Sequence, residues 1–411
     1  MKRITAPMLA LGMLAASLPS QGFAFGVADA GIVHDVAGVE ATPAGLAVLS
    51  SSDTLMFGNM DTGDGWDYTL LVSRVAGDGT VVWTRSGATS RPWSAQRVVA
   101  APGDTAVVLG YDIDGLNVHA YLARFDADGH ELWNRPADLG TVVMDLKTDA
   151  SSIWVLEGYD YDSRITRFSL DGEVLWQQSL RTLTGCAPAC ETYYPPVALA
   201  TDDNAGIVVL TSEASTQLPP STQLTKISPD GTLLWQTPSE DAEAPRLARS
   251  ASGALAVFSR VHDDTRLRVV VYDRDGAERW RQTIDTSLYT YADDVAFDTS
   301  DNVYALKDTV EACTVDAFAA DGTARWSHRW DTPEGCSNVA TLSVGTAVEP
   351  IVVLAGFDSG EAAHGIAPDG TTAFDTPIPG TAGFMSPLRR SADGAMLGLD
   401  MYRTGPMNMQ L

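Results

Sequence analysis

Short runs of alternating apolar and polar residues, separated by turn residues, recur along the chain. Residues 121–133 show the pattern once: YLARF alternates, an Asp-Gly pair follows, and HELW leads on to Trp133. Alternation with a period of two directs one face of a segment toward a core, which is typical of β-strands. Asp-Gly between two such runs favours a tight hairpin, because glycine adopts the positive φ that the turn requires. The pattern therefore predicts a strand, a turn and a second strand.

This strand–turn–strand phrase occurs seven times, with a mean spacing of about 48 residues. Its turn glycines are Gly79, Gly129, Gly172, Gly231, Gly276, Gly322 and Gly370. Four residues after each glycine stands an aromatic residue: Trp83, Trp133, Trp176, Trp235, Trp280, Trp326 and Phe374. A large aromatic side chain that recurs once per unit is best placed in a packed layer between neighbouring units. We therefore interpret these seven residues as structural.

A second hairpin precedes each phrase, as in DDVAFDTSDNVYALKD at 293–308, where the turn falls at Ser300–Asn302. Similar turns are predicted at Pro43–Gly45, Pro102–Asp104, Ala150–Ser152, Asn204–Gly206, Ala251–Gly253, Gly345–Glu349 and Ala392–Gly394. Each unit then has four strands, A to D. Four-stranded units at this period indicate an all-β protein with the architecture of a β-propeller.

Eight first hairpins stand against seven second hairpins, which bears on the number of blades. The stretch 381–411 supplies strands A and B and a short strand C, PMNMQL, but no strand D. We predict that Gly31–His34 supplies the missing strand, so that an N-terminal strand closes the last blade and covers the open edges. The prediction is a single propeller domain over residues 25–411 with eight blades; seven blades are the alternative.

The first residues resemble a targeting segment. Lys2 and Arg3 precede the apolar run MLALGMLAASL, and small residues follow it. A positive start, an apolar run too short to span a bilayer and a small-residue cleavage site are typical of a signal peptide. Residues 1–24 are therefore predicted to be removed, and the mature chain to be periplasmic or secreted.

Disulfides persist in such a compartment, and the chain has four cysteines. Of the three possible pairings, the most local joins Cys186 to Cys190 and Cys313 to Cys336. A redox or metal-binding role is the alternative. The spacing CAPAC is neither a CxxC redox motif nor a usual half of a zinc site.

Charge narrows the range of partners. The formal net charge is −26 and the sequence pI is about 4.4, with four lysines in 411 residues. Binding to nucleic acid requires clustered Lys and Arg, so this class is excluded, and anionic lipid surfaces are disfavoured for the same reason. We expect a monomer that does not insert into a membrane.

No motif for catalysis or cofactor binding stands out. GxGxxG, a Walker-type GK[ST], HExxH and GxSxG are all missing, so no catalytic or cofactor-binding residue is assigned. The acidic run DTGDGWD supplies weak metal candidates at Asp61, Asp64 and Asp67. A calcium loop of the EF-hand type needs glutamate at its twelfth position, which is Val72 here, so that pattern fails. No cofactor is predicted, with calcium or a quinone as the alternatives.

The connections between strands are unequal, and this is the main functional clue. In a propeller the B–C and D–A connections emerge on one face; here they are long and rich in Asp and aromatic residues. Loops carried by a rigid scaffold are where recognition usually resides. We predict an acidic, aromatic binding face formed by Trp66, Trp93, Tyr111, Tyr159, Tyr161, Tyr193, Tyr194, Tyr289 and Tyr291. The alternative is that these are ordinary solvated loops.

SLDGEVLW resembles the glycine–three residues–tryptophan docking signature of bacterial quinoprotein-like (PQQ-like) propeller repeats. VAFDTSDNVYALKD is similar to the A–B hairpin of secreted bacterial propeller repeats. The resemblance covers the whole mature chain and implies blade-to-blade packing for the six tryptophans of the phrase. The family divides into quinone-dependent dehydrogenases and non-catalytic scaffolds, including the propeller lipoprotein of the outer-membrane assembly machine. This chain lacks the adjacent cysteine pair and the cofactor clamp of the dehydrogenases, and the lipidated cysteine of the lipoprotein.

These observations favour a non-catalytic extracytoplasmic scaffold that engages a protein or glycan of the cell envelope through its loop-rich face. A quinoprotein-like oxidoreductase is one alternative and depends on fold analogy alone. A carbohydrate-active lyase or hydrolase is the other, because carboxylates are abundant although no pair stands out.

Overall fold

The computed structural model describes residues 10–14, 32–35, 41–61, 68–76, 80–87, 93–114, 117–139, 142–158, 163–183, 196–202, 206–213, 221–239, 242–261, 265–286, 290–309, 312–331, 341–357, 360–378, 389–390 and 396–397. The chain divides into two compact units, Met1–Ala137 with Val352–Gly365 and Thr372–Leu411, and Asp138–Ile351 with Ile366–Thr371. Across the described ranges, no helix is long and apolar enough to cross a membrane.

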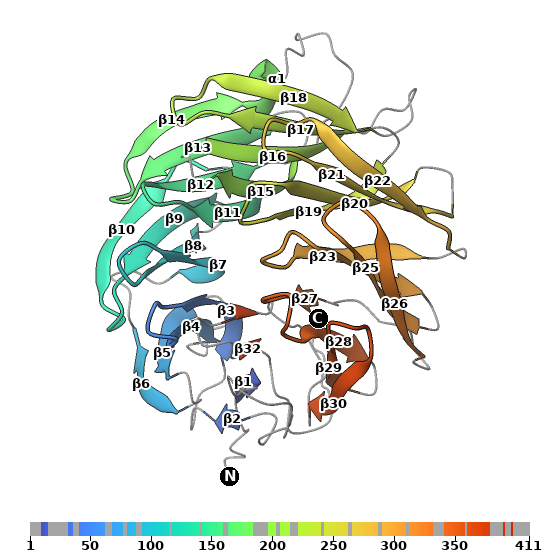
Figure 1. The fold of residues 1–411 in the computed structure, drawn as a ribbon. Helices are drawn as coiled ribbons and strands as arrows, with labels where there is room; N and C mark the ends of the chain where they lie inside the picture. The colour runs from blue at the N-terminus through green and yellow to red at the C-terminus, as the bar shows by residue number, and fades with distance from the viewer. Residues whose placement is uncertain are drawn as a thin grey trace. The chain divides into compact units, whose positions relative to one another are not determined.

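The first unit contains two regular antiparallel sheets (Figure 1). One has the order β3 (Ala41–Val48), β4 (Thr54–Asp61), β5 (Tyr68–Val75), β6 (Val81–Ser86). The other has the order β7 (Ser94–Ala101), β8 (Thr105–Asp114), β9 (Asn117–Phe125), β10 (Glu131–Ala137). The first strands of the two sheets, β3 and β7, lie side by side.

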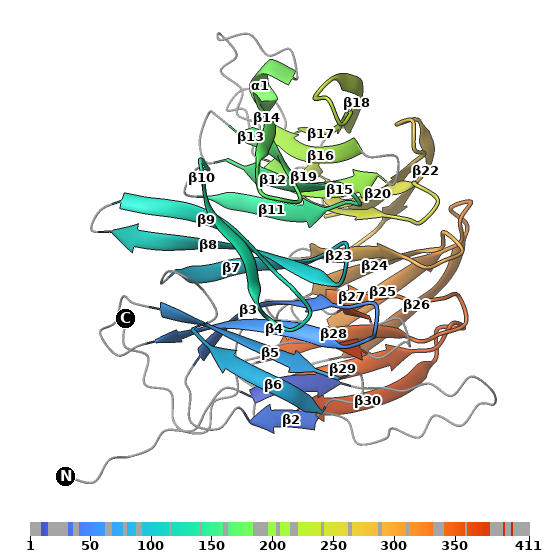
Figure 2. The same ribbon diagram turned by 90° about the vertical axis from the view of Figure 1, so that its left-hand side faces the viewer.

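The second unit contains four more sheets of the same kind (Figure 2). Their strands are β11 (Val143–Thr148), β12 (Ser152–Glu157), β13 (Arg164–Ser169) and β14 (Val174–Ser179); β15 (Pro196–Asp202), β16 (Gly206–Glu213), β17 (Ser221–Ile227) and β18 (Leu233–Ser239); β19 (Ala242–Arg249), β20 (Leu255–Val261), β21 (Leu267–Tyr272) and β22 (Glu278–Ile284); β23 (Tyr291–Phe297), β24 (Val303–Thr309), β25 (Ala312–Phe318) and β26 (Ala324–Asp331). The short helix α1 (Leu180–Leu183) follows β14. The first strands β11, β15, β19 and β23 are neighbours in turn.

A seventh sheet has the order β27 (Thr341–Ser343), β28 (Ile351–Phe357), β29 (Gly360–Ile366), β30 (Thr372–Ile378). In the described part of the chain, seven sheets thus consist of four consecutive strands each. Repeated four-stranded antiparallel sheets, packed so that their first strands are neighbours, are the blades of a β-propeller. The all-β propeller prediction is confirmed.

The prediction of eight blades is wrong, and the alternative of seven matches the consecutive sheets. The remaining sheet joins short segments from both ends of the chain, β1 (Ala10–Leu14), β2 (Ile32–Asp35), β31 (Arg389–Arg390) and β32 (Met396–Leu397), in the order β2-β1-β32-β31. The segment expected to close a blade therefore pairs with β1, inside the predicted signal peptide, and not with a C-terminal strand. The expected strand PMNMQL lies outside the described residues. Strands of two residues form too few ladder hydrogen bonds to make a regular blade.

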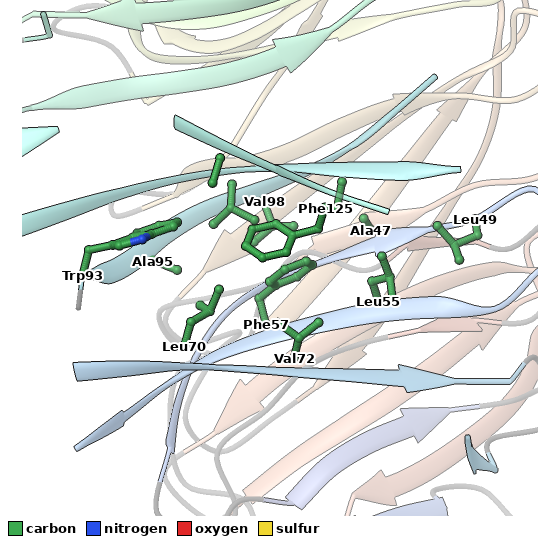
Figure 3. Close-up of a cluster of buried hydrophobic side chains, with 13 residues drawn as sticks. Ala47, Leu49, Leu55, Phe57, Leu70, Val72, Trp93, Ala95, Val98 and Phe125 are labelled. Atoms are coloured by element: carbon green, nitrogen blue, oxygen red, sulfur yellow. The ribbon is translucent and has the colours of Figure 1, made fainter. Parts of the chain in front are cut away.

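Hydrophobic side chains fill the space between neighbouring sheets. Between the first two, Phe57 of β4 and Phe125 of β9 meet edge to face, with ring centroids 5.3 Å apart (Figure 3). Leu55, Leu70 and Val72 lie in the same cluster and are almost completely buried. The alternating pattern of the sequence therefore corresponds to one face of each strand packed against the adjacent blade.

The turns confirm the local prediction in most places. The phrase glycines that are described all have positive φ, from 74° at Gly129 to 88° at Gly370. The predicted turn at Pro43–Gly45 is wrong: these residues form a bulge inside β3, and the chain turns at 49–53 instead, where Leu49 N donates to Asp53 O. Extra residues in a bulge are tolerated within a strand, and Pro and Gly mark such sites as readily as turns.

Candidate functional site

The predicted binding face is represented by three described residues, Trp93, Tyr111 and Tyr291. Trp66, Tyr159, Tyr161, Tyr193, Tyr194 and Tyr289 lie outside the described residues. Tyr111 lies in the second half of β8, opposite Ser94 of β7, and is half-buried. Tyr291 is the first residue of β23 and is 52% exposed.

Trp93 has a different place from the one predicted. It is 2% exposed and belongs to the core cluster between the first two blades (Figure 3). A Cβ atom added to Gly110 of β8 would come within 2.0 Å of the Trp93 ring, so the indole occupies space that only a glycine leaves open. Burial removes Trp93 from the binding face, and its role is to pack two sheets together.

The start of β23 carries the exposed Tyr291 beside a group of charged residues. The sequence YADDVAF begins with this tyrosine, opposite Asp308 of β24, and continues with the buried Ala292. The register with β24 then shifts between Ala292 and Asp294, which makes Asp293 the extra residue of a β-bulge. Bulges redirect side chains and are frequent at functional edges of sheets.

The two aspartates of this bulge have opposite surroundings. Asp294 accepts hydrogen bonds from Val295 N at 2.9 Å and, through Oδ2, from Leu342 N at 2.8 Å and Thr341 Oγ1 at 3.1 Å. Asp293 contributes its backbone carbonyl, which accepts from Arg246 Nε at 2.7 Å. Its carboxylate Oδ2, in contrast, is buried and has no hydrogen-bond partner in the described part of the chain.

These surroundings change the pKa values of both aspartates. Burial raises the pKa of Asp293 to about 8, and repulsion from Asp308 adds to the rise while Arg246 opposes it. Burial also raises the pKa of Asp294 above its ordinary value, although the hydrogen bonds that it accepts work against the change. A neutral carboxyl with a shielded Oδ2 can hold a proton inside the bulge, but it offers a substrate little access.

The predicted structural aromatics contact the following blade. A Cβ atom added to Gly322 would lie 2.7 Å from the indole of Trp280, and Gly370 is as close to Trp326. Trp280 Nε1 donates to Ala320 O at 3.0 Å, and Trp326 Nε1 to Pro368 O at 2.9 Å, in each case two residues before the turn glycine.

Three other members of the aromatic set follow this arrangement. Trp235 lies against Gly276, Trp176 against Gly231 and Trp83 against Gly129. Trp133 is half-buried on β10. Phe374 departs because its ring covers Gly365 on the adjacent strand of its own sheet. The aromatics are half-buried, since one side of each ring remains at the edge of its sheet.

The remaining candidates are only partly described. Cys313 is fully buried on β25, while Cys186, Cys190 and Cys336 lie outside the described residues, so the pairing stays a prediction. Asp61 ends β4, and Asp64 and Asp67 are not described, so the calcium candidate also stays a prediction. Within the described ranges, no group of three or more His, Cys, Asp or Glu is placed to hold a metal ion.

Sequence reasoning missed the bulge aspartates. Asp294 has a counterpart in Asp145 on β11, which also follows a bulge and accepts from Leu199 N of the next blade at 2.9 Å. The corresponding residues on β15 and β19 are Ala198 and Arg246, so no periodic signal exists. The available signal was local: two adjacent acidic residues in a segment that otherwise alternates.

A comparison with models of protein families shows which family the chain belongs to. The family model of the outer membrane protein assembly factor BamB matches residues 70–218 and 220–383, which is more than half of the chain. The chain belongs to that family. The match confirms the resemblance to PQQ-like propeller repeats. No curated protein matches the chain.

Solved structures show likeness of fold alone. Prolyl oligopeptidase B from Galerina marginata, bound to a 35mer substrate, gives a TM-score of 0.51 at 9% identity and covers 87% of this chain and 54% of that one. A prolyl endopeptidase structure gives 0.50 at 13% identity, with 87% and 52% covered. The chain thus spans about half the length of these two peptidases. The β-propeller domain of the Trilobed protease from Pyrococcus furiosus gives 0.49 at 8% identity, with 81% and 98% covered.

Proposed function

We propose that the protein is an extracytoplasmic, non-catalytic scaffold that engages a protein or glycan through the loop-bearing ends of its strands. The observation that carries the proposal is Tyr291, which is 52% exposed at the first position of a rigid strand. An amphipathic ring held by a sheet offers contact area at little entropic cost, which is why tyrosine is enriched in binding surfaces.

The charge around this tyrosine indicates the chemistry of the partner. Asp308 lies opposite Tyr291 on the paired strand β24. The net charge of −26 adds a field of the same sign. A partner that presents basic or hydrogen-bond-donating groups would be steered toward such a face.

Family membership supports the location and the type of role. The family carries the name of an outer membrane protein assembly factor. We therefore propose a monomer in the cell envelope that carries no cofactor and binds a partner in the same compartment. Rigid blades with recognition in their connections suit that role.

The test compares three forms of the full chain as bait for envelope extract from the source cells and on a glycan array. Tyr291→Ala should lower capture of the dominant partner about tenfold, which corresponds to loss of one central aromatic contact. Leu234→Ala is the matched control, because Leu234 is 54% exposed on the outer strand β18. This control should retain capture.

A second variant tests the part of the face that the sequence predicts but the structure does not describe. Replacement of Trp66, Tyr159 and Tyr161 together should also weaken capture and leave the thermal midpoint unchanged. Equal capture by wild type, Tyr291→Ala and this triple variant would contradict the proposed face. Turnover of a captured glycan would contradict the non-catalytic role.

A further inference from the structure

The bulge at the start of β23 contains a carboxyl group that the binding proposal does not use. Asp293 is the extra residue in the register between β23 and β24, and its Oδ2 is buried without a hydrogen-bond partner in the described residues. A buried polar atom without a partner is destabilising, and it is more so when it carries a charge. The feature therefore calls for an explanation.

Two other carboxylates and one cation act on Asp293. Asp294 is next in the chain, Asp308 lies on β24, and Arg246 lies on β19. The guanidinium of Arg246 bonds to two backbone carbonyls, of Asp293 at 2.7 Å and Ala244 at 3.5 Å. Its hydrogen bonds are thus made to peptide oxygens, and its charge only partly offsets the carboxylates.

Other described strands that pack against β23 also carry charged residues. Lys307, beside Asp308 on β24, pairs with Asp316 of β25 at 2.6 Å. Strand β20 also packs against β23, and its one charged residue, Arg260, is paired in register with Glu243 of β19. Strand β27 contributes the neutral donors Thr341 and Leu342, and both bond to Asp294.

We propose that Asp293 is a proton-dependent latch: its neutral carboxyl keeps the β23 bulge closed between β19 and β27, and its ionisation loosens the start of that strand. Ionisation would place a negative charge on a buried oxygen that has no partner among the described residues and lies beside two other carboxylates. Opening the bulge would return that oxygen to water. Tyr291 lies two residues away and would move with the bulge. The inference concerns the conformation of β23 and stands whether or not the proposed partner binding is correct.

The direction of the pH effect follows from linkage. The pKa of Asp293 is raised from 3.8 to about 8 by burial first and by Asp308 second, so the closed state binds the proton more tightly than an opened one. The neutral carboxyl of Asp293 therefore stabilises the closed state fully below pH 3.8. This stabilisation falls as pH rises and is lost once pH passes about 8. One proton exchanged on opening changes the opening constant by about tenfold per pH unit within this window.

Hydrogen exchange of the peptide covering 290–309, corrected for intrinsic rates, measures this opening between pH 5 and 9 in the full chain. Relative to Asp293→Asn, the wild type should open progressively more, by about tenfold per pH unit from pH 5 until a plateau near pH 8. Asn has a similar shape and does not ionise in this range, so its own pH dependence reports all other groups.

Two further variants keep the test decisive. Asp308→Asn retains Asp293 but removes a charge that raises its pKa, so the plateau should move to lower pH even where Asp293→Asn folds poorly. Asp321→Asn is the control, since Asp321 is exposed in a hairpin turn and its hydrogen bonds with Thr323 lower its pKa. It should leave the exchange of 290–309 unchanged. The latch would be overturned if hydrogen exchange of 290–309 had the same pH dependence in wild type and in Asp293→Asn. It would also be overturned if the plateau of exchange in Asp308→Asn stayed at the wild-type pH.

Discussion

Two levels of contact join the blades of the second unit, and they differ in regularity. At the outer level, a tryptophan of one blade lies over the turn glycine of the next, as Trp280 does over Gly322. At the inner level, a carboxylate at a bulge accepts an N–H of the next blade, as Asp294 accepts from Leu342. The outer contact recurs from blade to blade, whereas Ala198 and Arg246 replace the inner carboxylate on β15 and β19.

The difference shows which contacts depend on particular side chains. The indole of Trp280 lies where a Cβ on Gly322 would overlap it, so this tryptophan and the facing glycine must be kept together. An inner-strand bulge is a backbone feature that many residues can occupy. The inner positions are therefore free to vary, and they are where charge and proton affinity differ between blades.

The largest effect is expected where the outer contact is blocked. Gly322→Val should lower the free energy of unfolding by about 3 kcal/mol, because φ at Gly322 is +87° and the new Cβ would overlap Trp280. Gly103→Val is the matched control, with φ of +79° and nothing within 4 Å, and should cost about 1 kcal/mol. Denaturant unfolding measures both. Equal losses would show that the indole contact is unimportant.

A smaller effect is expected at the inner level. Asp294→Ala should cost about 2 kcal/mol, because it leaves the amide N–H groups of Val295 and Leu342 without their acceptor. Asp294→Asn keeps one oxygen acceptor and should cost less. Thermal and denaturant unfolding at one pH give the comparison. A loss in Asp294→Ala that equals or exceeds that of Gly322→Val would reverse the ranking of the two levels.

The smallest effect on stability is expected from a change at Arg279, beside Trp280 on the outer strand β22. Arg279 precedes Trp280 and lies 4.0 Å from Asp301 with its side chain 40% exposed. The corresponding residues two blades and one blade earlier are Leu175 and Leu234, both about half exposed. Arg279→Leu should therefore change stability by less than about 0.5 kcal/mol. A larger loss would show that the surface ion pair contributes to the outer contact.

Much of the outer level was predictable because it is local and repeated. The positive φ of the phrase glycines and the hairpins around them follow from five or six consecutive residues. The partner of each tryptophan follows from the repeat itself, since the same phrase returns one blade later. The tryptophans are half-buried in this layer, because the outermost strand of a sheet has one open side.

The errors occurred where a residue's surroundings come from distant parts of the chain. Trp93 stands in a polar connection, SRPWSA, which indicates an exposed loop. Its burial is decided by Phe57 and Leu70 of the preceding blade and by the missing side chain of Gly110. The count of eight blades failed for a similar reason, because hairpins counted along the chain do not specify how its two ends pair.

The sequence by itself determined the repeating hairpins, the all-β architecture and the spacing of tryptophan and glycine, because turn geometry and strand alternation are local properties of a polypeptide. Tertiary structure alone decided which aromatics are exposed and which carboxyl groups are shielded, because burial depends on what the neighbouring sheet places opposite. Asp293 illustrates the division: two adjacent aspartates look alike in the chain, and packing gives one of them three hydrogen-bond donors and leaves the other's Oδ2 without a partner in the described residues.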